Sequence, residues 1–420
     1  MARKLLVIMI DGISADQYEK AAHALPHLQM LEQRGFRVQR LHSETIGVSL
    51  PGRTSILTGV TADVSGIYGN HIWDQTTGEF RYATPDDVRV PTLAARAKRE
   101  GLKVANIGLG MVRPEDTDIF MAPWWVTDMI QRGRDPVPEP SPQGWLKAVY
   151  HPLEEEFVAL CQKANLPSRL ANIQTLPAAF QSQAFYGLYA DHRFMEWSGL
   201  LAAAEDAPNL ILTEFLVTDE FLHYTGYDND MSQWALEQAD LALGKIMLRL
   251  HQADMINEWN VVVLSDHGHS PITNAIFPQR LLPDVALVCE GSCLLMAVKD
   301  KTQLDTITAQ LAAYGVEPYP NDCLPPEHRE QIAMFVAPDG TAFEDIRPEE
   351  LGITGTPKLI SSHGLRPGAA GDDRFALFAG PNVPMGRVDS AEAAQIAPTL
   401  AALLGLNSDS FDSAPIFSTL

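Results

Sequence analysis

The sequence predicts an α/β fold with a mostly parallel central sheet and helices on both faces of that sheet. Short apolar runs such as Leu5–Ile10 and Asn260–Leu264 suit strands that are buried on both faces, and they alternate with segments of helical periodicity. Several of these runs end in carboxylates, at the strand ends where open α/β sheets bind ligands. No internal repeat or low-complexity tract interrupts this alternation. Together these observations favour one large α/β domain.

Length and composition agree with a globular protein. The chain has 420 residues, of which 46% are hydrophobic, and this is enough to build a sizeable core. The formal net charge of −22, without any basic run, argues against a surface that binds nucleic acid. The four cysteines have no regular spacing, so we expect buried free thiols and no disulfide framework: Cys161, Cys289, Cys293 and Cys323.

The N-terminus bears a superficial likeness to a signal peptide. The apolar run Leu5–Ile10 has only six residues before Asp11, and no small-residue cleavage site follows it. No stretch of the sequence reaches the ~18 apolar residues that a membrane span needs. We therefore expect a soluble, cytoplasmic protein without a membrane partner, which would be periplasmic or secreted if a leader had been removed.

The first half of the chain alternates strand and helix signals that end at turn residues. Helical periodicity stops at glycines, which favour the left-handed conformation found after many helices. Apolar runs between these helices predict further strands. The expected elements are a helix over Ala21–Gly35, a strand over Phe36–His42, a helix over Ser49–Gly59, a helix over Pro91–Gly101 and a strand over Lys103–Ile107.

The second half continues the same pattern, with two interruptions. Prolines cluster over residues 136–142 and amphipathic helices follow, so we expect a helical lid insertion over residues 124–208. Mixed strand and helix signals over residues 283–343 predict a small α+β insertion. Both insertions belong to a single catalytic domain that we expect over residues 1–420. Its later elements are strands over Asn209–Val217, Asn260–Leu264 and Phe375–Ala379, and helices over Met231–His251 and Ala391–Leu404.

The stretch from Ser49 to Gly59 is the centre of the predicted site. It runs Ser-Leu-Pro-Gly-Arg-Thr-Ser-Ile-Leu-Thr-Gly, and Pro51 suits the first turn of a helix because its φ is preset. The hydroxyl of Ser49 would lie at the start of that helix, where backbone N–H groups favour negative charge. Such a hydroxyl can be ionised and can attack phosphorus or sulfur. The alternative is an ordinary N-capping serine.

Candidate metal ligands follow three separate strands. An aspartate follows each of these strands. One histidine comes four residues after the second aspartate, one comes directly after the third, and one precedes a glycine near the C-terminus. Each residue taken alone has a structural explanation as a helix cap or turn. Because the ends of parallel strands converge, the set as a whole favours catalysis and suits zinc, with manganese or iron as weaker options. The six candidates are Asp11, Asp219, His223, Asp266, His267 and His363.

Ser49-x-Pro and Asn70 lie between Asp11 and Asp219 in the sequence. The order of all these residues resembles that of the alkaline phosphatase superfamily. Within it, the chain is most similar to the type I phosphodiesterase/nucleotide pyrophosphatase branch, which includes phosphonoacetate hydrolase. The resemblance covers nearly the whole chain. It implies an alkaline phosphatase-like fold and a zinc-dependent hydrolase of phosphodiester, pyrophosphate or phosphonate bonds in small-molecule substrates.

The resemblance also implies roles for the candidate residues. One zinc would be held by Asp219, His223 and His363. The second zinc would be held by Asp11, Asp266 and His267 together with the Ser49 oxygen. Ser49 would attack the substrate to form a phosphoserine, which water then hydrolyses.

Asn70 matches the family position whose side-chain amide donates to a non-bridging phosphate oxygen. Its position after Gly69 equally suits a left-handed turn residue, and the sequence leaves these two alternatives open.

The substrate is less well defined than the metal site. Leu50 stands where nucleotide pyrophosphatases carry an aromatic residue, so stacking on a nucleobase would need a tryptophan such as Trp73, Trp124 or Trp125. The segment from Tyr68 to Glu79 is closer to phosphonoacetate hydrolase, which needs a cation for the substrate carboxylate. The candidates for that cation are Arg53, Lys103 and Arg113.

Other functions remain open on the sequence alone. Ser49-x-Pro-x-Arg53 also resembles the sulfatase signature, in which the first residue is converted to formylglycine. A pseudoenzyme that holds metal and binds a phosphorylated partner is a non-enzymatic alternative. His269 is an additional imidazole beside the expected site, and nothing in the sequence indicates the oligomeric state.

Overall fold

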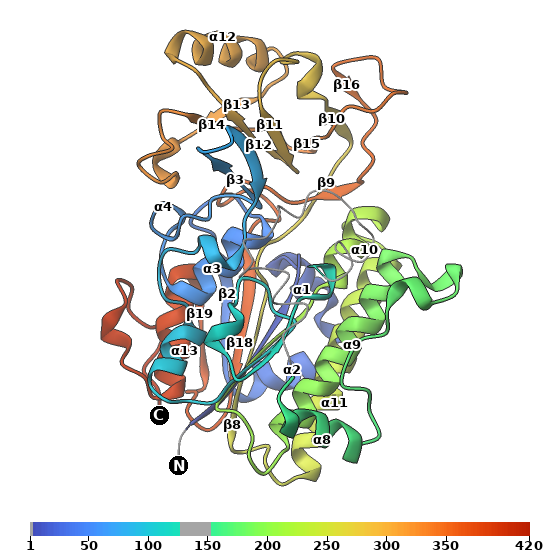
Figure 1. The fold of residues 1–420 in the computed structure, drawn as a ribbon, viewed down its shortest axis with the longest axis vertical. Coiled ribbons are helices and arrows are strands. Elements are labelled where there is room, and N and C mark those ends of the chain that lie inside the picture. Colours follow the sequence, from blue (N-terminus) through green and yellow to red (C-terminus); the bar gives the residue numbers. More distant parts are fainter. Residues whose placement is uncertain (1–2, 127–152) are drawn as a thin grey trace.

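The computed structural model describes residues 3–126 and 153–420, and an eight-stranded sheet runs through this part of the chain (Figure 1). β18 runs antiparallel to its two neighbours, and the other neighbouring strands are parallel. The predicted fold class is confirmed. In spatial order the strands are β19 (Gly386–Glu392), β2 (Phe36–His42), β18 (Arg374–Ala379), β8 (Trp259–Leu264), β1 (Lys4–Ile10), β7 (Leu210–Phe215), β5 (Val104–Ile107) and β6 (Ile119–Met121).

β1 shows why the first apolar run of the sequence has no polar face. It pairs in parallel with β7 on one side and with β8 on the other. Leu5 and Val7 enter the hydrophobic core on one face of the sheet, while Leu6 and Ile8 enter the core on the other face. Burial of each such side chain contributes roughly 1.5–3 kcal/mol, so both faces of the sheet need a layer of helices.

Helices cover both faces of the sheet (Figure 1). The core that contains Leu5 packs against α3 (Ser49–Thr58), α5 (Leu93–Arg99) and α13 (Ile396–Leu404). The helix expected over Ala21–Gly35 is divided, because Pro26 starts a new helix after the non-helical Leu25. The helices of the opposite core are α1 (Ala15–Ala21), α2 (Pro26–Arg34), α9 (Gln183–Ala202), α10 (Val217–Thr225) and α11 (Asp230–Gln252).

The described part of the predicted helical lid belongs to the core. α9 packs against β7 and α11, and it buries Tyr186, Phe194 and Trp197 in the core on that face of the sheet. The shorter α8 (Glu155–Lys163) adds Phe157 to the same core. These helices therefore form a layer over the sheet, because their large side chains face it. Residues 127–152 of the predicted lid lie outside the described residues.

A small α+β unit lies beyond one end of the central sheet (Figure 1). Its antiparallel sheet has the order β11 (Leu287–Glu290), β12 (Cys293–Ala297), β14 (Ile332–Val336) and β13 (Glu317–Tyr319). Leu294 packs toward α12 (Lys301–Ala312), while Leu295 joins the core that contains Leu5. One face of this sheet is thus covered by its own helix, and the other face rests on the main domain.

Shorter strands connect the small unit to the main domain. β10 (Asn274–Ile276), β15 (Thr341–Phe343) and β16 (Thr354–Gly355) form a second small sheet, so the unit extends beyond residues 283–343. β9 (Ser270–Pro271) pairs with β17 (Ser361–Ser362) beside the strand ends of the central sheet. The hairpin of β3 (His71–Asp74) and β4 (Glu79–Tyr82) follows α3 and the one-turn α4 (Ala62–Ser65).

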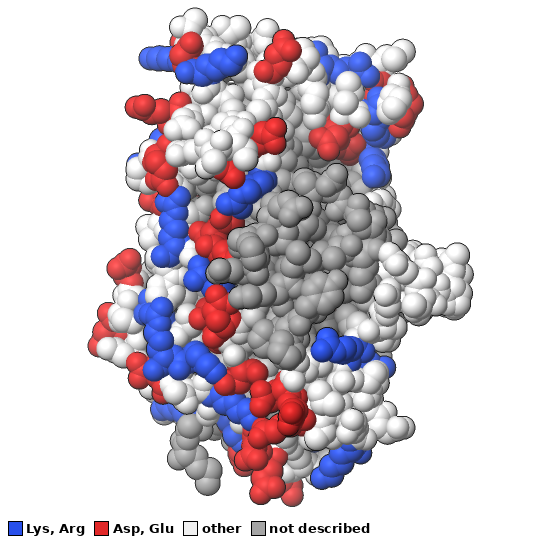
Figure 2. All heavy atoms as spheres, viewed as in Figure 1, with Lys and Arg blue, Asp and Glu red and all other residues white. Residues whose placement is uncertain are grey.

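Two observations describe the helices and one face of the surface. Among the described residues, no helix combines the length and apolarity needed to cross a bilayer. On the face shown in Figure 2, lysine and arginine side chains are interspersed with aspartate and glutamate. On this face, basic groups therefore lie next to acidic ones.

Candidate active site

Three neighbouring strands of the central sheet end at the same edge. Ile10 of β1 is in register with Phe215 of β7, and Met9 is in register with Leu264 of β8. Asp11 follows β1 directly, and Asp266 comes two residues after β8. Parallel pairing therefore brings the carboxylates of separate chain segments together, as the sequence predicted.

Ser49 begins α3 at this edge. Val48 occupies the N-cap position and no side chain caps the helix, so Ser49 is not an N-capping serine. Its Oγ lies 3.0 Å from His267 Nε2. The helix can approach this closely because residue 52 is glycine: a Cβ there would lie 2.1 Å from the carbonyl oxygen of Asp266.

The first cluster consists of Asp219, His223, His269 and His363, whose candidate ligand atoms all lie within 4.8 Å of one another. Asp219 and His223 are four residues apart on α10 and point the same way, with 3.3 Å between Oδ2 and Nε2. His363 comes from the loop after β17, and its ring centre lies 5.0 Å from that of His223. The structure thus brings together the three residues predicted for one ion and adds His269 to them.

The second cluster consists of Asp11, Asp266 and His267. His267 Nε2 lies 3.1 Å from Asp11 Oδ1 and 3.9 Å from Asp266 Oδ2. The same Nε2 lies 4.0 Å from Asp219 Oδ1, so the two clusters are neighbours. Ser49 Oγ stands beside the second cluster, as the sequence predicted for the second ion.

Hydrogen bonds outside the clusters fix the histidine rings. His223 Nδ1 lies 2.9 Å from the carbonyl oxygen of Ser361, and His267 Nδ1 lies 3.1 Å from that of Gly268. A carbonyl accepts, so each Nδ1 carries the proton and each Nε2 is directed into its cluster. His269 Nε2 lies 2.6 Å from Asp219 Oδ1, and its Nδ1 lies 3.0 Å from Ser361 Oγ.

Arg53 is buried beneath the second cluster, with 1% of its surface exposed. Its guanidinium forms ion pairs with Asp11, with Glu214 at 3.3 Å and with Asp266 at 3.4 Å. Arg53 therefore lies among carboxylates and away from any substrate, so the expectation that it binds substrate does not hold. When ionised, these three carboxylates exceed the one guanidinium by two negative charges, which a divalent cation would neutralise.

The chemistry of the donor atoms fits such cations. His363 Nδ1 is buried without a hydrogen-bond partner in the described structure, and Asp266 Oδ2 has only the ion pairs with Arg53 at 3.4 Å and His267 at 3.9 Å. Buried polar atoms of this kind are costly unless something binds them. Imidazole and carboxylate donors in groups of three and four are typical zinc ligands, and manganese and iron share them.

Burial and mutual charge shift the protonation of these groups. Burial raises the pKa of Asp266 to about 6, with Asp11 adding to the effect. Although burial opposes it, the charges of Asp266 and Asp11 raise the pKa of His267 to about 9. Burial lowers the pKa of His269 to about 4. Without a cation, His267 therefore keeps its proton near neutral pH, and metal binding at its Nε2 would release that proton.

Asn70 lies directly beside Ser49. The backbone N–H of Leu50 donates to Asn70 Oδ1 at 2.9 Å, and the Asn70 N–H donates to Glu290 Oε2 at the same distance. Because Oδ1 faces the backbone, the Nδ2 amide group is the part left to donate elsewhere. The φ angle of Asn70 is not positive, so Asn70 is not a left-handed turn residue.

The other expected substrate contacts lie away from the site. Trp73 Nε1 donates to Gln331 of the small unit at 3.2 Å, and its ring packs against Phe80, so its surroundings are structural. Lys103 precedes β5 at the opposite end of the sheet and pairs with Glu156 at 3.0 Å. Arg113 donates to backbone carbonyls, including that of Val88 at 2.9 Å.

Three charged residues near the site were not predicted. Glu214 lies within the buried strand β7, and burial raises its pKa to about 8. The one available signal was a glutamate inside an apolar run. Glu290 and Lys358 line a cavity next to the first cluster, and both belong to the small unit, whose sequence carries no motif for this site.

Comparison with known proteins decides the family. A model described as type I phosphodiesterase/nucleotide pyrophosphatase matches residues 5–349 of the chain. The chain belongs to this family. Membership confirms the expected branch of the alkaline phosphatase superfamily, and the two clusters are candidate metal sites of this chain.

Individual family members are distant relatives. Bis(5′-adenosyl)-triphosphatase ENPP4 of Mus musculus is 23% identical over 272 residues, which are 64% of this chain and 47% of the relative. The Homo sapiens protein of that name is 23% identical over 270 residues, 63% of this chain and 47% of the relative. The chain thus spans about half the length of the curated relatives it matches.

Solved structures of family members share the fold. Murine ectonucleotide pyrophosphatase/phosphodiesterase 5, in an inactive form in complex with AMP, has a TM-score of 0.69 at 18% identity. This likeness covers 98% of this chain and 97% of the murine one. The human protein of the same name has a TM-score of 0.67 at 15% identity, covering 98% and 97%.

These comparisons correct the expected localisation. The solved relatives are named as ectonucleotide enzymes, a term for enzymes that act outside the cell. The prediction of a cytoplasmic protein is therefore wrong.

Proposed function

We propose that this chain is a zinc-dependent hydrolase of phosphodiester or pyrophosphate bonds that acts through a covalent intermediate on Ser49. The observation that carries the proposal is the position of Ser49 Oγ at the start of α3, 3.0 Å from His267 Nε2 of the second cluster. In this proposal, Asp219, His223 and His363 hold one ion. Asp11, Asp266, His267 and the Ser49 oxygen hold the other.

Bound divalent ions would supply two effects: a lower pKa for the Ser49 hydroxyl, and neutralisation of charge on the phosphoryl oxygens. The Ser49 hydroxyl loses its proton to solvent, and Oγ attacks phosphorus. The Oγ–P bond forms as the bond from phosphorus to the leaving oxygen breaks, and that oxygen keeps the bonding pair. Water then attacks the same phosphorus and releases Ser49.

Asn70 and α3 stabilise the charge that develops in these steps. The Asn70 Nδ2 amide group would donate to a non-bridging oxygen, since its Oδ1 is held by the Leu50 N–H at 2.9 Å. Backbone N–H groups in the first turn of α3 also favour an anion in this position. Arg53 holds the carboxylates of Asp11 and Asp266 without reaching the substrate.

Nucleotides are the substrate class that the relatives favour. ENPP4 of Mus musculus is named a bis(5′-adenosyl)-triphosphatase, and murine ENPP5 has been solved with AMP. We extend this preference for nucleotide-containing small molecules to the present chain, although Leu50 supplies no aromatic ring for a base. Tyr82 and Tyr224 line the neighbouring cavity and offer other rings.

A hydrolysis panel with metal analysis tests the proposal. The panel compares p-nitrophenyl esters of phosphate, phenylphosphonate, thymidine monophosphate and sulfate, together with phosphonoacetate. We expect preference for the diester and the phosphonate ester, with two zinc ions per chain. Phosphate release from phosphonoacetate alone would indicate C–P cleavage, and sulfate turnover with one calcium ion would indicate a sulfatase; either result contradicts the proposal.

A further inference from the structure

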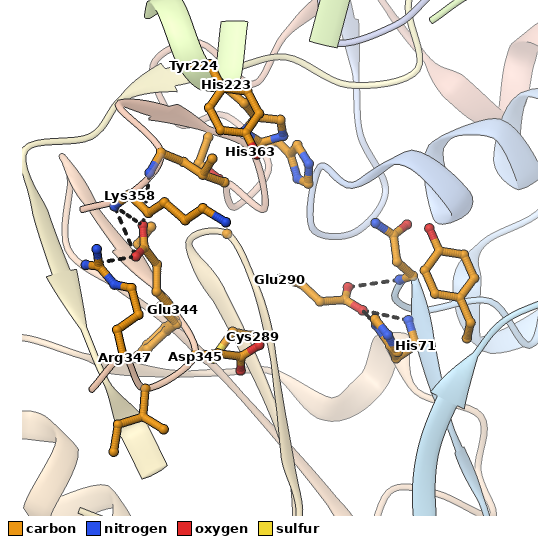
Figure 3. Close-up of a pocket in the computed structure, with 18 residues that line it drawn as sticks. His71, His223, Tyr224, Cys289, Glu290, Glu344, Asp345, Arg347, Lys358 and His363 are labelled. Atoms are coloured by element: carbon orange, nitrogen blue, oxygen red, sulfur yellow. Dashed lines mark hydrogen bonds and ion pairs between the residues drawn. The ribbon is translucent and has the colours of Figure 1, made fainter. Parts of the chain in front are cut away.

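A cavity of about 420 Å³ opens beside the first cluster, between the main domain and the small unit (Figure 3). His223 and His363 line one part of it, and Asn70 lines another. Ser49 and the residues of the second cluster are not among its lining residues. The cavity therefore adjoins the first cluster and Asn70, and Ser49 lies outside its wall.

Most charged groups in the wall of this cavity are held by other protein groups. Glu290 accepts hydrogen bonds from the backbone N–H of Asn70 at 2.9 Å and of His71 at 2.6 Å. Glu344 forms an ion pair with Arg347 at 3.4 Å. Asp345 accepts from the side chain of Gln279 at 2.9 Å. These groups are structural parts of the wall.

Lys358 differs from them. Its backbone N–H donates to Glu344 Oε1 at 2.8 Å, so the base of the residue is fixed in the wall. Its side chain is exposed and points into the cavity, on the side opposite Glu290 (Figure 3). No carboxylate of the described residues forms an ion pair or hydrogen bond with its Nζ. A fixed backbone with an unpaired ammonium group in a cavity suits an anionic ligand.

The direction of the proposed reaction identifies which part of a substrate would meet this lysine. In an in-line displacement the leaving group departs on the side opposite the attacking oxygen. Ser49 lies beside the second cluster, whereas the cavity adjoins His223 and His363 of the first. The leaving group would therefore enter the cavity that contains Lys358.

We propose that Lys358 binds an anionic group, phosphate or carboxylate, on the leaving group and so selects substrates whose leaving group carries one. This inference rests on the proposed function for the direction of displacement. It makes the lysine a determinant of substrate choice, without a part in bond breaking itself.

Matched substrates test this selectivity in the zinc-loaded full chain. Bis(5′-adenosyl) triphosphate has a leaving group with phosphates, and phosphonoacetate has one with a carboxylate. In the p-nitrophenyl ester of thymidine monophosphate, the leaving group has no anionic substituent. For Lys358→Ala we expect kcat/KM to fall roughly tenfold on one or both anionic substrates and to stay within about twofold on the ester.

The variants include their own controls. Lys358→Arg should restore most of the loss, because it returns the charge. Lys301→Ala removes another exposed lysine of the small unit that does not line the cavity, and it should leave all rates unchanged. A loss on the triphosphate identifies phosphate as the recognised group, and a loss on phosphonoacetate identifies carboxylate. Equal losses on all substrates, or no loss, would overturn the proposal.

Equilibrium binding separates this proposal from the proposed function. If the wild-type chain hydrolyses none of these substrates, the proposed function fails, and calorimetry with α,β-methylene-ADP and AMP still tests Lys358. We expect Lys358→Ala to weaken binding of α,β-methylene-ADP roughly tenfold and binding of AMP much less. Equal affinities of wild type and variant for α,β-methylene-ADP would contradict a role for Lys358.

Discussion

Ser49 Oγ and His267 Nε2 lie 3.0 Å apart, although 218 residues separate them in the sequence. The contact joins the first turn of α3 to the loop after β8. It depends on Gly52, because a Cβ at that position would meet the carbonyl oxygen of Asp266. Close packing of two backbones thus holds Ser49, the proposed nucleophile, against the second cluster.

Replacement of Ser49 by alanine should abolish turnover and leave the fold intact. The side chain makes its contact with the cluster through the hydroxyl, and the apolar face of α3 remains buried. We expect kcat to fall to background with zinc still bound, since six protein ligands remain. Metal analysis beside the assay distinguishes loss of the nucleophile from loss of the ions. Full activity in Ser49→Ala would exclude a serine mechanism.

Replacement of Asn70 by alanine should reduce kcat by roughly 10²–10³-fold, the usual effect of removing one donor to a developing oxyanion. Asn70→Asp is the matched control, because its carboxylate can still accept from the Leu50 N–H at this position but cannot donate to phosphate. Both variants should bind zinc as the wild type does. Recovery of activity in Asn70→Asp would show that the residue only supports α3.

The burial of Glu214 predicts a pH-dependent stability, and the charge of the neighbouring Arg53 opposes this effect in part. Burial raises the pKa of Glu214 from 4.5 to about 8. Between these two pH values, the folded chain therefore binds a proton that the unfolded chain releases. The sign follows from linkage: the stabilising contribution of this group is complete below about pH 4.5 and is lost as the pH rises through about 8.

Urea unfolding of the metal-free chain at pH 5.5 and pH 8 measures this effect. The free energy of unfolding of the wild type, relative to Glu214→Gln, should decrease between the two pH values, because glutamine stays neutral. Arg53→Met should cost about 3–5 kcal/mol, since it leaves buried carboxylates without their cation. A constant difference between wild type and Glu214→Gln would mean that Glu214 remains ionised throughout.

His269 is expected to position Asp219. Its Nε2 lies 2.6 Å from Asp219 Oδ1, and the other carboxylate oxygen faces His223. Loss of such a supporting hydrogen bond typically weakens metal affinity 10–100-fold. His269→Ala should therefore weaken the binding of one zinc ion and leave the other unchanged in a chelator competition. His269→Gln, which can still donate to Asp219, should recover part of the affinity.

The sequence could predict that the candidate metal ligands lie close together, because their positions follow from strand ends. Asp11 and Asp266 had to converge once β1 and β8 were parallel neighbours, and His223 had to accompany Asp219 on a helical turn. Glu214 and Lys358 could not be predicted in this way. Their roles depend on which groups lie opposite them across the sheet and the cavity. The spacing of residues along the chain does not predict these neighbours.

The errors have a common physical origin. Arg53 and Trp73 were assigned to the substrate from residue type, because arginine binds anions and tryptophan stacks on bases. Burial decided otherwise: Arg53 compensates carboxylates below the site, and Trp73 contacts Gln331 between the hairpin and the small unit. The long helix α9 was placed in a lid, yet its large apolar side chains pack on the sheet.

The mass of the peptide that contains Ser49, measured after acid quench during turnover, tests the central claim most directly. With the p-nitrophenyl ester of thymidine monophosphate as substrate, we expect a fraction of this peptide to carry a thymidylyl group on Ser49. The resting enzyme should carry an unmodified serine. A resting mass lower by two hydrogens would reveal formylglycine, and a peptide that stays unmodified throughout rapid turnover would contradict a covalent intermediate on Ser49.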